Sequence, residues 1–200
     1  MKSEDLNALI TLLKIPRLRK KLLINLFNAN ISLSDFTNNP SRYHKYCPLN
    51  ENMQNILAQE MKLTQFNKLK EFEWLEQSNM NHIITYNDFH YPETLRNIPD
   101  PPILLYLVGD PDCLSLPQIA VVGSRKPSIY GKENAKFFST ELSNNGYCIT
   151  SGLAYGIDAI AHSSTLQNKG KTIAVMGTGI NMIYPAKNKA IAEKIIHNGA

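Results

Sequence analysis

The stretch IAVVGSRKPSIYG at residues 119–131 joins a run of apolar residues to a glycine-containing loop and then to a helical pattern. The same order returns in ITSGLAYGIDAIAH at 149–162 and in KTIAVMGTGINMIYPAKN at 171–188. Short apolar strands that alternate with amphipathic helices are typical of a parallel sheet covered by helices. These residues therefore predict an α/β fold with a Rossmann-like, mostly parallel sheet.

The helix expected over residues 130–144 follows the first of these strands. Its spacing predicts that Ala135, Phe137, Phe138 and Leu142 face inward. A further strand is expected at 103–108. A fourth strand of the parallel sheet is expected after Gly199, so the sheet is predicted to be incomplete at the C-terminus, as in a truncated chain.

The chain ahead of this segment has a helical pattern. Apolar side chains recur at helical spacing from residue 5 to residue 28, interrupted at Pro16, and two more helical patterns cover 51–61 and 64–77. Four short helices are therefore expected. We predict two domains: a small helical N-terminal domain over residues 1–80 and a Rossmann-like domain over residues 81–200.

Composition excludes several classes of protein. The 200 residues are 43% hydrophobic, which is too apolar for a disordered chain. No apolar run reaches the length of about 18 residues that a membrane helix needs, and the N-terminus is a poor secretory signal, so a cytoplasmic protein without membrane contact is expected. Cys47, Cys113 and Cys148 are too scattered for a disulfide framework or a zinc site, and no metal or cofactor is expected.

Positive charge is concentrated in the last segment. Residues 119–200 hold nine Lys or Arg and four Asp or Glu, whereas residues 82–118 hold one and five. This balance favours an anionic partner for the last segment, although lysines that only solvate helix faces would give the same count.

Each of the three strands of the last segment is followed by a loop of small residues, and parallel strands bring such loops to one edge. Glycines allow a close approach of backbone to a ligand, and the hydroxyls of Ser124, Ser151 and Thr178 are candidate donors to an anion. Arg125 suits bidentate phosphate contact, with Lys126 beside it and Lys187 near the third loop. The loops therefore predict a site for a phosphate or an extended phosphodiester.

Known nucleotide fingerprints do not match. The first loop reads GSRKPSIYG instead of GxGxxG, and no GxxxxGK[ST] sequence leads into a helix. Asp158 and His162 have the i, i+4 spacing of an acid–base pair, but a first-turn acid with a packed histidine has the same spacing. Tyr155 and Tyr184 suit either base stacking or packing.

The motifs at 119–131, 149–162 and 171–188, with YPETLRNIPDPPILLYLVGD at 91–110, together resemble the DNA-processing protein A family, DprA or Smf. The resemblance implies a protein that binds single-stranded DNA without catalysis, helps load a RecA-type recombinase in natural transformation, and forms a homodimer. It implies binding by Gly123, Ser124, Arg125 and Lys187. Together with the loops above, it points to these pocket-building residues: Ser151, Gly152, Gly156, Asp158, His162, Thr178, Gly179.

The chain departs from the family pattern in two places. Tyr155 stands where the family usually has a basic residue, and the first eighty residues lack the glycine-marked turn of a DNA-binding helix-hairpin-helix, so no DNA contact is expected there. Two alternatives stay open. One is a nucleotide hydrolase that uses Asp158 and His162 on a similar sheet, and the other is a nonfunctional remnant.

Overall fold

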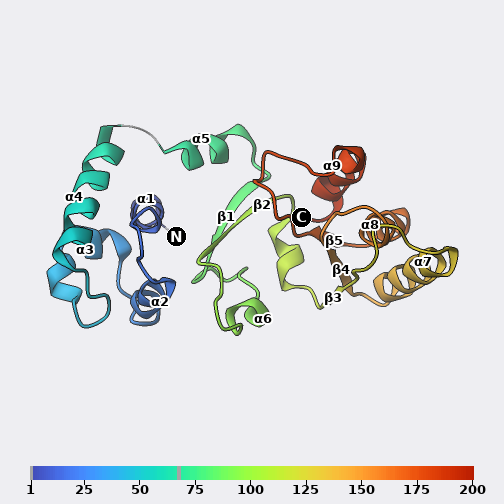
Figure 1. Cartoon of the computed structure of the whole chain (residues 1–200), viewed down its shortest axis with the longest axis horizontal. Coiled ribbons are helices and arrows are strands. Elements are labelled where there is room, and N and C mark those ends of the chain that lie inside the picture. Colours follow the sequence, from blue (N-terminus) through green and yellow to red (C-terminus); the bar gives the residue numbers. More distant parts are fainter. Residues whose placement is uncertain (1, 67–68) are drawn as a thin grey trace. The chain divides into compact units, whose positions relative to one another are not determined.

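A computed structural model describes residues 2–66 and 69–200 (Figure 1). The chain divides into two compact units. The first unit comprises Met1–Ser78 and Ile83–Leu105, and the second comprises Asn79–His82 and Tyr106–Ala200. The division passes through both strands of a two-stranded sheet, β1 (Asn81–Thr85) and β2 (Leu104–Val108). The single domain boundary expected at residue 80 therefore stays a prediction.

The first unit is largely helical. Among residues 2–66 and 69–80, five α-helices precede β1, one more than expected, because Ser32 accepts a hydrogen bond from the Asp35 amide and so caps a short helix that the sequence pattern did not predict. The elements of this unit besides the two strands are α1 (Ser3–Leu13), α2 (Lys20–Asn28), α3 (Leu33–Asn38), the 3-10 turn η1 (Pro40–Tyr43), α4 (Glu51–Phe66), α5 (Lys70–Gln77) and α6 (Glu93–Arg96).

The core of the first unit forms where the apolar stripes of α1, α2 and α3 meet. Leu9, Leu12, Leu26 and Phe36 are completely buried there. Each buried side chain of this size contributes about 1.5–3 kcal/mol of transfer free energy. The helical spacing seen in the sequence thus produces one continuous core in this unit.

The second unit contains a parallel sheet in the order β3–β4–β5 (Figure 1). Its strands pair in parallel, with Ile119 opposite Ile149 and Thr150 opposite Ile173. The predicted α/β, Rossmann-like fold is confirmed. The elements of this unit are the 3-10 turn η2 (Pro111–Ser115), β3 (Gln118–Ala120), α7 (Ile129–Asn144), β4 (Cys148–Ser151), α8 (Ile157–Gln167), β5 (Thr172–Ala174), the 3-10 turn η3 (Ala186–Asn188) and α9 (Lys189–Asn198).

The inward face of α7 differs from the expected one. Ala135 and Ser139 are buried, whereas Phe137 is 59% exposed and Phe138 is 54% exposed. α7 packs against α8, and Ala135 and Ser139 lie one turn apart on the same face. Small side chains on that face allow the two helices to approach, and the phenylalanines point elsewhere. The prediction for Phe137 and Phe138 was wrong.

Candidate functional site

The loops that follow β3, β4 and β5 leave the sheet at one edge, because all three strands run in parallel. Val121, just beyond β3, donates its amide to the Thr150 carbonyl over 3.0 Å, and Val175, just beyond β5, donates its amide to the Ser151 carbonyl over 2.8 Å. The first residues of the first and third loops are therefore hydrogen-bonded to the last residues of the central strand, β4.

The first and second loops touch through their backbones. The Ile157 amide donates to the Ser124 carbonyl over 3.2 Å. Gly156 adopts φ +81°, and a β-carbon at this position would lie 2.2 Å from the Ser124 oxygen. A β-carbon on Gly123 would lie 2.8 Å from the Ile157 side chain. Both glycines are therefore required for the two loops to meet.

A buried asparagine joins the second loop to η3, the 3-10 turn that follows the third loop. The Asn188 side-chain amide donates to the carbonyls of Leu153 and Ala154, over 2.8 and 3.1 Å. Asn188 ends η3 and is itself buried. Asn188 ends the 171–188 motif, but no role was predicted for it from the sequence. Its position just after a Tyr-Pro loop, at the start of a helix, was the available signal.

The buried side chain of Asp158 accepts hydrogen bonds from the backbone of the second loop. Its Oδ2 atom accepts hydrogen bonds from the amides of Gly152 and Ala154, over 3.1 and 3.3 Å, and the residue is buried in the first turn of α8. A carboxylate at the start of a helix is also stabilised by the helix dipole. Asp158 therefore fixes the shape of the loop.

His162 lies in the core of the second unit. Its Nδ1 atom is 2.7 Å from Oγ1 of Thr172, and that hydroxyl donates to the Ile149 carbonyl over 2.6 Å. Nδ1 must therefore carry the proton. Burial lowers the pKa of His162 to about 4, so the imidazole is neutral at neutral pH. This buried, neutral histidine and the loop-bound Asp158 match the packing alternative and not an exposed acid–base pair.

The hydroxyls expected to act as donors are largely engaged. Ser151 donates to the Val121 carbonyl over 2.6 Å, and Thr178 donates to the Met182 carbonyl over 2.7 Å. Ser124 instead accepts a hydrogen bond from the Lys126 amide over 3.1 Å, which leaves its proton available. Of the three expected donors, only Ser124 is therefore poised to donate to a ligand. The protons of Ser151 and Thr178 are used by backbone carbonyls of the loops, and a contact of either residue with a ligand stays a prediction.

The exposed cations lie on the first loop and in η3. Arg125, Lys126 and Lys187 are all exposed, and within residues 2–66 and 69–200 none of the three forms an ion pair. Tyr184 is 63% exposed beside them in sequence. A β-carbon added at Gly179 would meet no atom within 4 Å, so the third loop is open at this position and packing does not require a glycine there. The edge thus combines amides, one free hydroxyl and unpaired cations.

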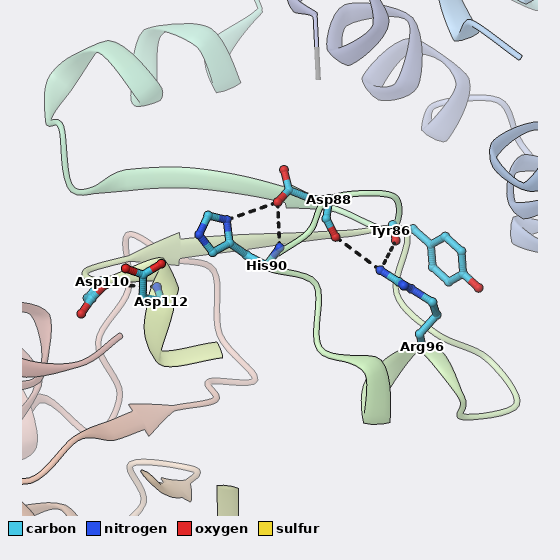
Figure 2. Close-up of polar contacts among 6 residues, drawn as sticks. All are labelled: Tyr86, Asp88, His90, Arg96, Asp110 and Asp112. Atoms are coloured by element: carbon cyan, nitrogen blue, oxygen red, sulfur yellow. Dashed lines mark hydrogen bonds and ion pairs between the residues drawn. The ribbon is translucent and has the colours of Figure 1, made fainter. Parts of the chain in front are cut away.

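A second polar cluster, in the first unit, joins residues 86–90 to the N-terminal part of the 91–110 motif (Figure 2). Arg96 donates from Nη2 to the carbonyls of Tyr86 and Asp88, over 3.1 and 3.3 Å, and its guanidinium lies over the rings of Tyr86 and Tyr91. Asp88 in turn accepts hydrogen bonds from the backbone amide of His90 at 3.0 Å. The cluster ties a loop to a short helix and leaves little of the guanidinium for a ligand.

The described part of the chain contains neither a candidate metal site nor a candidate membrane-spanning helix. Residues 2–66 and 69–200 contain no group of three or more His, Cys, Asp or Glu side chains placed to hold a metal ion. Among the same residues, no helix combines the length and the apolar character that crossing a bilayer requires.

Three glycine- or serine-containing loops, joined at the carboxyl edge of a parallel sheet and bordered by unpaired cations, define a Rossmann-like α/β protein with an edge suited to anions. Residues 82–200 match the family described as DNA recombination-mediator protein A. The chain therefore belongs to the DNA-processing protein A (DprA/Smf) family.

Curated relatives agree with this assignment. Protein Smf of Synechocystis sp. is 40% identical over 141 residues, which cover 68% of this chain and 35% of the relative. The DNA processing protein DprA of Streptococcus pneumoniae is 47% identical over 105 residues, covering 52% of this chain and 37% of the relative. The chain thus spans about a third of the length of these relatives.

Solved structures agree as well. The X-ray structure of DprA from Streptococcus pneumoniae superposes with a TM-score of 0.72 at 29% identity, covering 96% of this chain and 65% of that one. A structure of DNA processing protein A from Helicobacter pylori, described for its unique mode of binding single-stranded DNA, gives a TM-score of 0.50 at 35% identity, covering 54% of this chain and 49% of that one.

Proposed function

We propose that this chain binds single-stranded DNA, without catalysis, at the carboxyl edge of the β3–β4–β5 sheet. The observation that carries the proposal is the unpaired, exposed Arg125 on a loop held in place by the Ser124–Ile157 backbone hydrogen bond. A guanidinium fixed at its base suits a phosphodiester, which it can contact through two donors. The Helicobacter pylori relative, which binds single-stranded DNA, supports the choice of ligand.

The proposed contacts divide into two sets. Arg125, Lys126 and Lys187 neutralise phosphates, and Gly123 and Ser124 offer backbone and hydroxyl groups to the same chain of phosphates. The other residues shape the edge and are these: Ser151, Gly152, Gly156, Asp158, His162, Thr178, Gly179. Tyr184, exposed on the third loop, offers a face on which a base can stack. Such a site binds without strong sequence preference, because phosphates and stacking are common to all bases.

The wider role follows from the family. We propose that the protein helps load a RecA-type recombinase onto single-stranded DNA during natural transformation, as a homodimer in the cytoplasm. The rate of recombinase assembly on single-stranded DNA, measured with and without this protein, tests the loading role. Sedimentation of the purified chain over a range of concentrations tests the homodimer.

Fluorescence anisotropy with a labelled oligo-dT tests the binding site. Arg125→Ala should weaken binding about tenfold or more at low salt, and equally for other sequences of single-stranded DNA, because a charge-assisted phosphate contact is lost. The matched control is Lys194→Ala, which removes an exposed cation on α9 of the same unit. Equal binding by Arg125→Ala and the parent protein would overturn the site.

A turnover assay separates the proposal from a nucleotide hydrolase. The parent protein should release no product from nucleoside monophosphates over many equivalents of substrate. Multiple turnovers by the parent protein that Asp158→Ala abolishes would favour the hydrolase.

A further inference from the structure

A second concentration of positive charge lies in the first unit, on the segment that connects α1 to α2. We call residues 14–21 the cationic connector. Five of its eight residues are cations, namely Lys14, Arg17, Arg19, Lys20 and Lys21, and none is acidic. In a chain whose net charge is only +4, this is a strong local excess.

Two of the five cations are neutralised by carboxylates of the same unit. Lys20 Nζ lies 2.9 Å from Asp100 Oδ2, and Lys14 Nζ lies 3.8 Å from Glu60 Oε2. Arg17, Arg19 and Lys21 are exposed, and no ion pair joins any of them to another residue of the described chain. Three alternate positions therefore carry unpaired positive charge.

The connector is fixed in position by the core beneath it. Ile15 is 3% exposed, and Leu18 packs against the same cluster of buried residues. The Leu18 amide donates to the Ile15 carbonyl over 3.3 Å, and the Leu22 amide donates to the Arg19 carbonyl over 2.9 Å. Arg17 and Arg19 lie on a turn that is held in place and Lys21 lies at the start of α2, which reduces the ordering that a ligand would have to impose.

Arg17 has an unfavourable backbone conformation. Its φ is +65°, in the left-handed region that glycine adopts freely and that costs other residues about 1–2 kcal/mol. The sequence expectation excluded DNA contacts here because no glycine marks a hairpin turn. The connection between α1 and α2 nevertheless places an arginine in the conformation that glycine would favour. The surrounding structure must hold this residue in place, because the conformation is otherwise unfavourable.

We propose that the cationic connector binds the phosphodiester backbone of a polynucleotide through Arg17, Arg19 and Lys21. Two of the three are arginines, which pair with phosphate through two donors. The connector contains no aromatic residue on which a base could stack, so it contacts single and double strands alike. The inference adds a contact to the proposed function, and it rests on that function for the choice of a polynucleotide as the partner.

The test compares two triple variants of equal charge loss. Arg17→Ala/Arg19→Ala/Lys21→Ala removes the unpaired cations, and Lys45→Ala/Lys62→Ala/Lys70→Ala removes three other exposed cations of the first unit. Anisotropy with oligo-dT is measured over a salt series. The connector variant should flatten the slope of log K against log salt by about 2, since each neutralised phosphate of a single strand contributes about 0.7. The control should keep the parent slope.

The possible outcomes distinguish a failure of this inference from a failure of the proposed function. If the connector variant and the control variant have the same affinity and slope while Arg125→Ala loses binding, this inference is overturned and the proposed function stands. If the parent protein binds no oligo-dT at any salt concentration, the proposed function fails first. If the connector variant loses binding only to polyglutamate and not to DNA, the partner is an acidic protein and this inference is overturned.

A single substitution at Arg17 separates the effect of its charge on DNA binding from its effect on stability. Arg17→Gly relieves the left-handed conformation and removes one cation, so it should raise the melting temperature while flattening the salt slope by about 0.7. Asn30→Gly is the control, because Asn30 has φ +52° and carries no charge. It should leave the salt slope unchanged. An Arg17→Gly variant with the parent slope would refute the contact made by Arg17.

Discussion

Gly156 and Ser124 approach so closely that a β-carbon on Gly156 would lie 2.2 Å from the Ser124 carbonyl oxygen. The two residues belong to different loops, one ahead of α8 and the other after β3. The contact lets the Ser124 carbonyl accept the Ile157 amide, which sets the base of the loop that carries Arg125. The placement of the proposed phosphate contact thus depends on the absence of a side chain at residue 156.

Gly156→Ala should therefore destabilise the protein and weaken DNA binding together. The strain of a left-handed alanine costs about 1–2 kcal/mol, and the clash with Ser124 adds typically 1–3 kcal/mol. Thermal and urea unfolding, followed by circular dichroism, measure the loss. Gly146→Ala is the control, because Gly146 also has positive φ but a β-carbon there would meet nothing within 4 Å. Equal losses in the two variants would contradict the argument.

The buried His162 should make the protein less stable in mild acid. The folded pKa is about 4 and the ordinary value is 6.5, so between these values the unfolded chain binds the extra proton. Stability therefore falls as pH decreases from about 6.5 to 4, by roughly 3 kcal/mol in total, and this contribution is constant below pH 4.

The control for this prediction replaces the histidine with a group that cannot titrate. His162→Asn keeps a donor toward Thr172 and should flatten the stability profile between pH 6.5 and 4, while lowering stability at neutral pH. His44→Asn changes an exposed histidine and should leave the profile as it is. A parent profile that is flat over this range would show that His162 is not buried as described.

Arg96→Lys should destabilise the first unit although it conserves charge. Lysine cannot reproduce the pair of bonds to the Tyr86 and Asp88 carbonyls or the stacking on Tyr86, which together are worth about 1–3 kcal/mol. Arg42→Lys is the comparison, since the Arg42 side chain is 71% exposed and lies 3.9 Å from its carboxylate partner, Asp35. Melting temperatures should separate the two variants, with Arg42→Lys near the parent.

The cysteines should be unreactive in the folded protein. Burial raises the pKa of Cys47 and Cys113 to about 11 and that of Cys148 to about 12, and all three thiols are free. The thiolate fraction at neutral pH is then about 100-fold or more below that of an ordinary cysteine. Iodoacetamide labelling followed by mass spectrometry should show three modifications in denaturant and little in buffer. Rapid labelling of any cysteine in native protein would contradict its burial.

The sequence was sufficient for the parallel sheet because three short, largely apolar stretches each lead into a glycine-containing loop and then a helical pattern. It was insufficient for α7, where aromatic residues suggested the wrong face. Helix packing there depends on how closely two backbones approach, and Ser139 permits an approach that Phe137 and Phe138 would prevent. A sequence pattern reports hydrophobicity, whereas the buried face of α7 was decided by side-chain size.

The meeting of the three loops at one edge of the sheet was predictable from the sequence, whereas their individual hydrogen bonds were not. The binding roles of Gly123 and Arg125, taken from their place after the first strand and from the family resemblance, stay predictions. The hydroxyls of Ser151 and Thr178 were assigned to a ligand, yet each bonds to a carbonyl whose position follows only from the folded loops. Asn188 was overlooked for the same reason, because its partners Leu153 and Ala154 are more than thirty residues away in sequence.

The loops of the β3–β4–β5 edge are held by main-chain atoms and by two buried side chains, Asp158 and Asn188. The shape of this edge is therefore set by one group of residues, and its electrostatic potential is set by another. If the proposed site is right, surface substitutions at Arg125 or Lys126 would change the affinity for a polyanion without changing the shape of the loops, so a protein engineer could adjust that affinity without redesigning the scaffold.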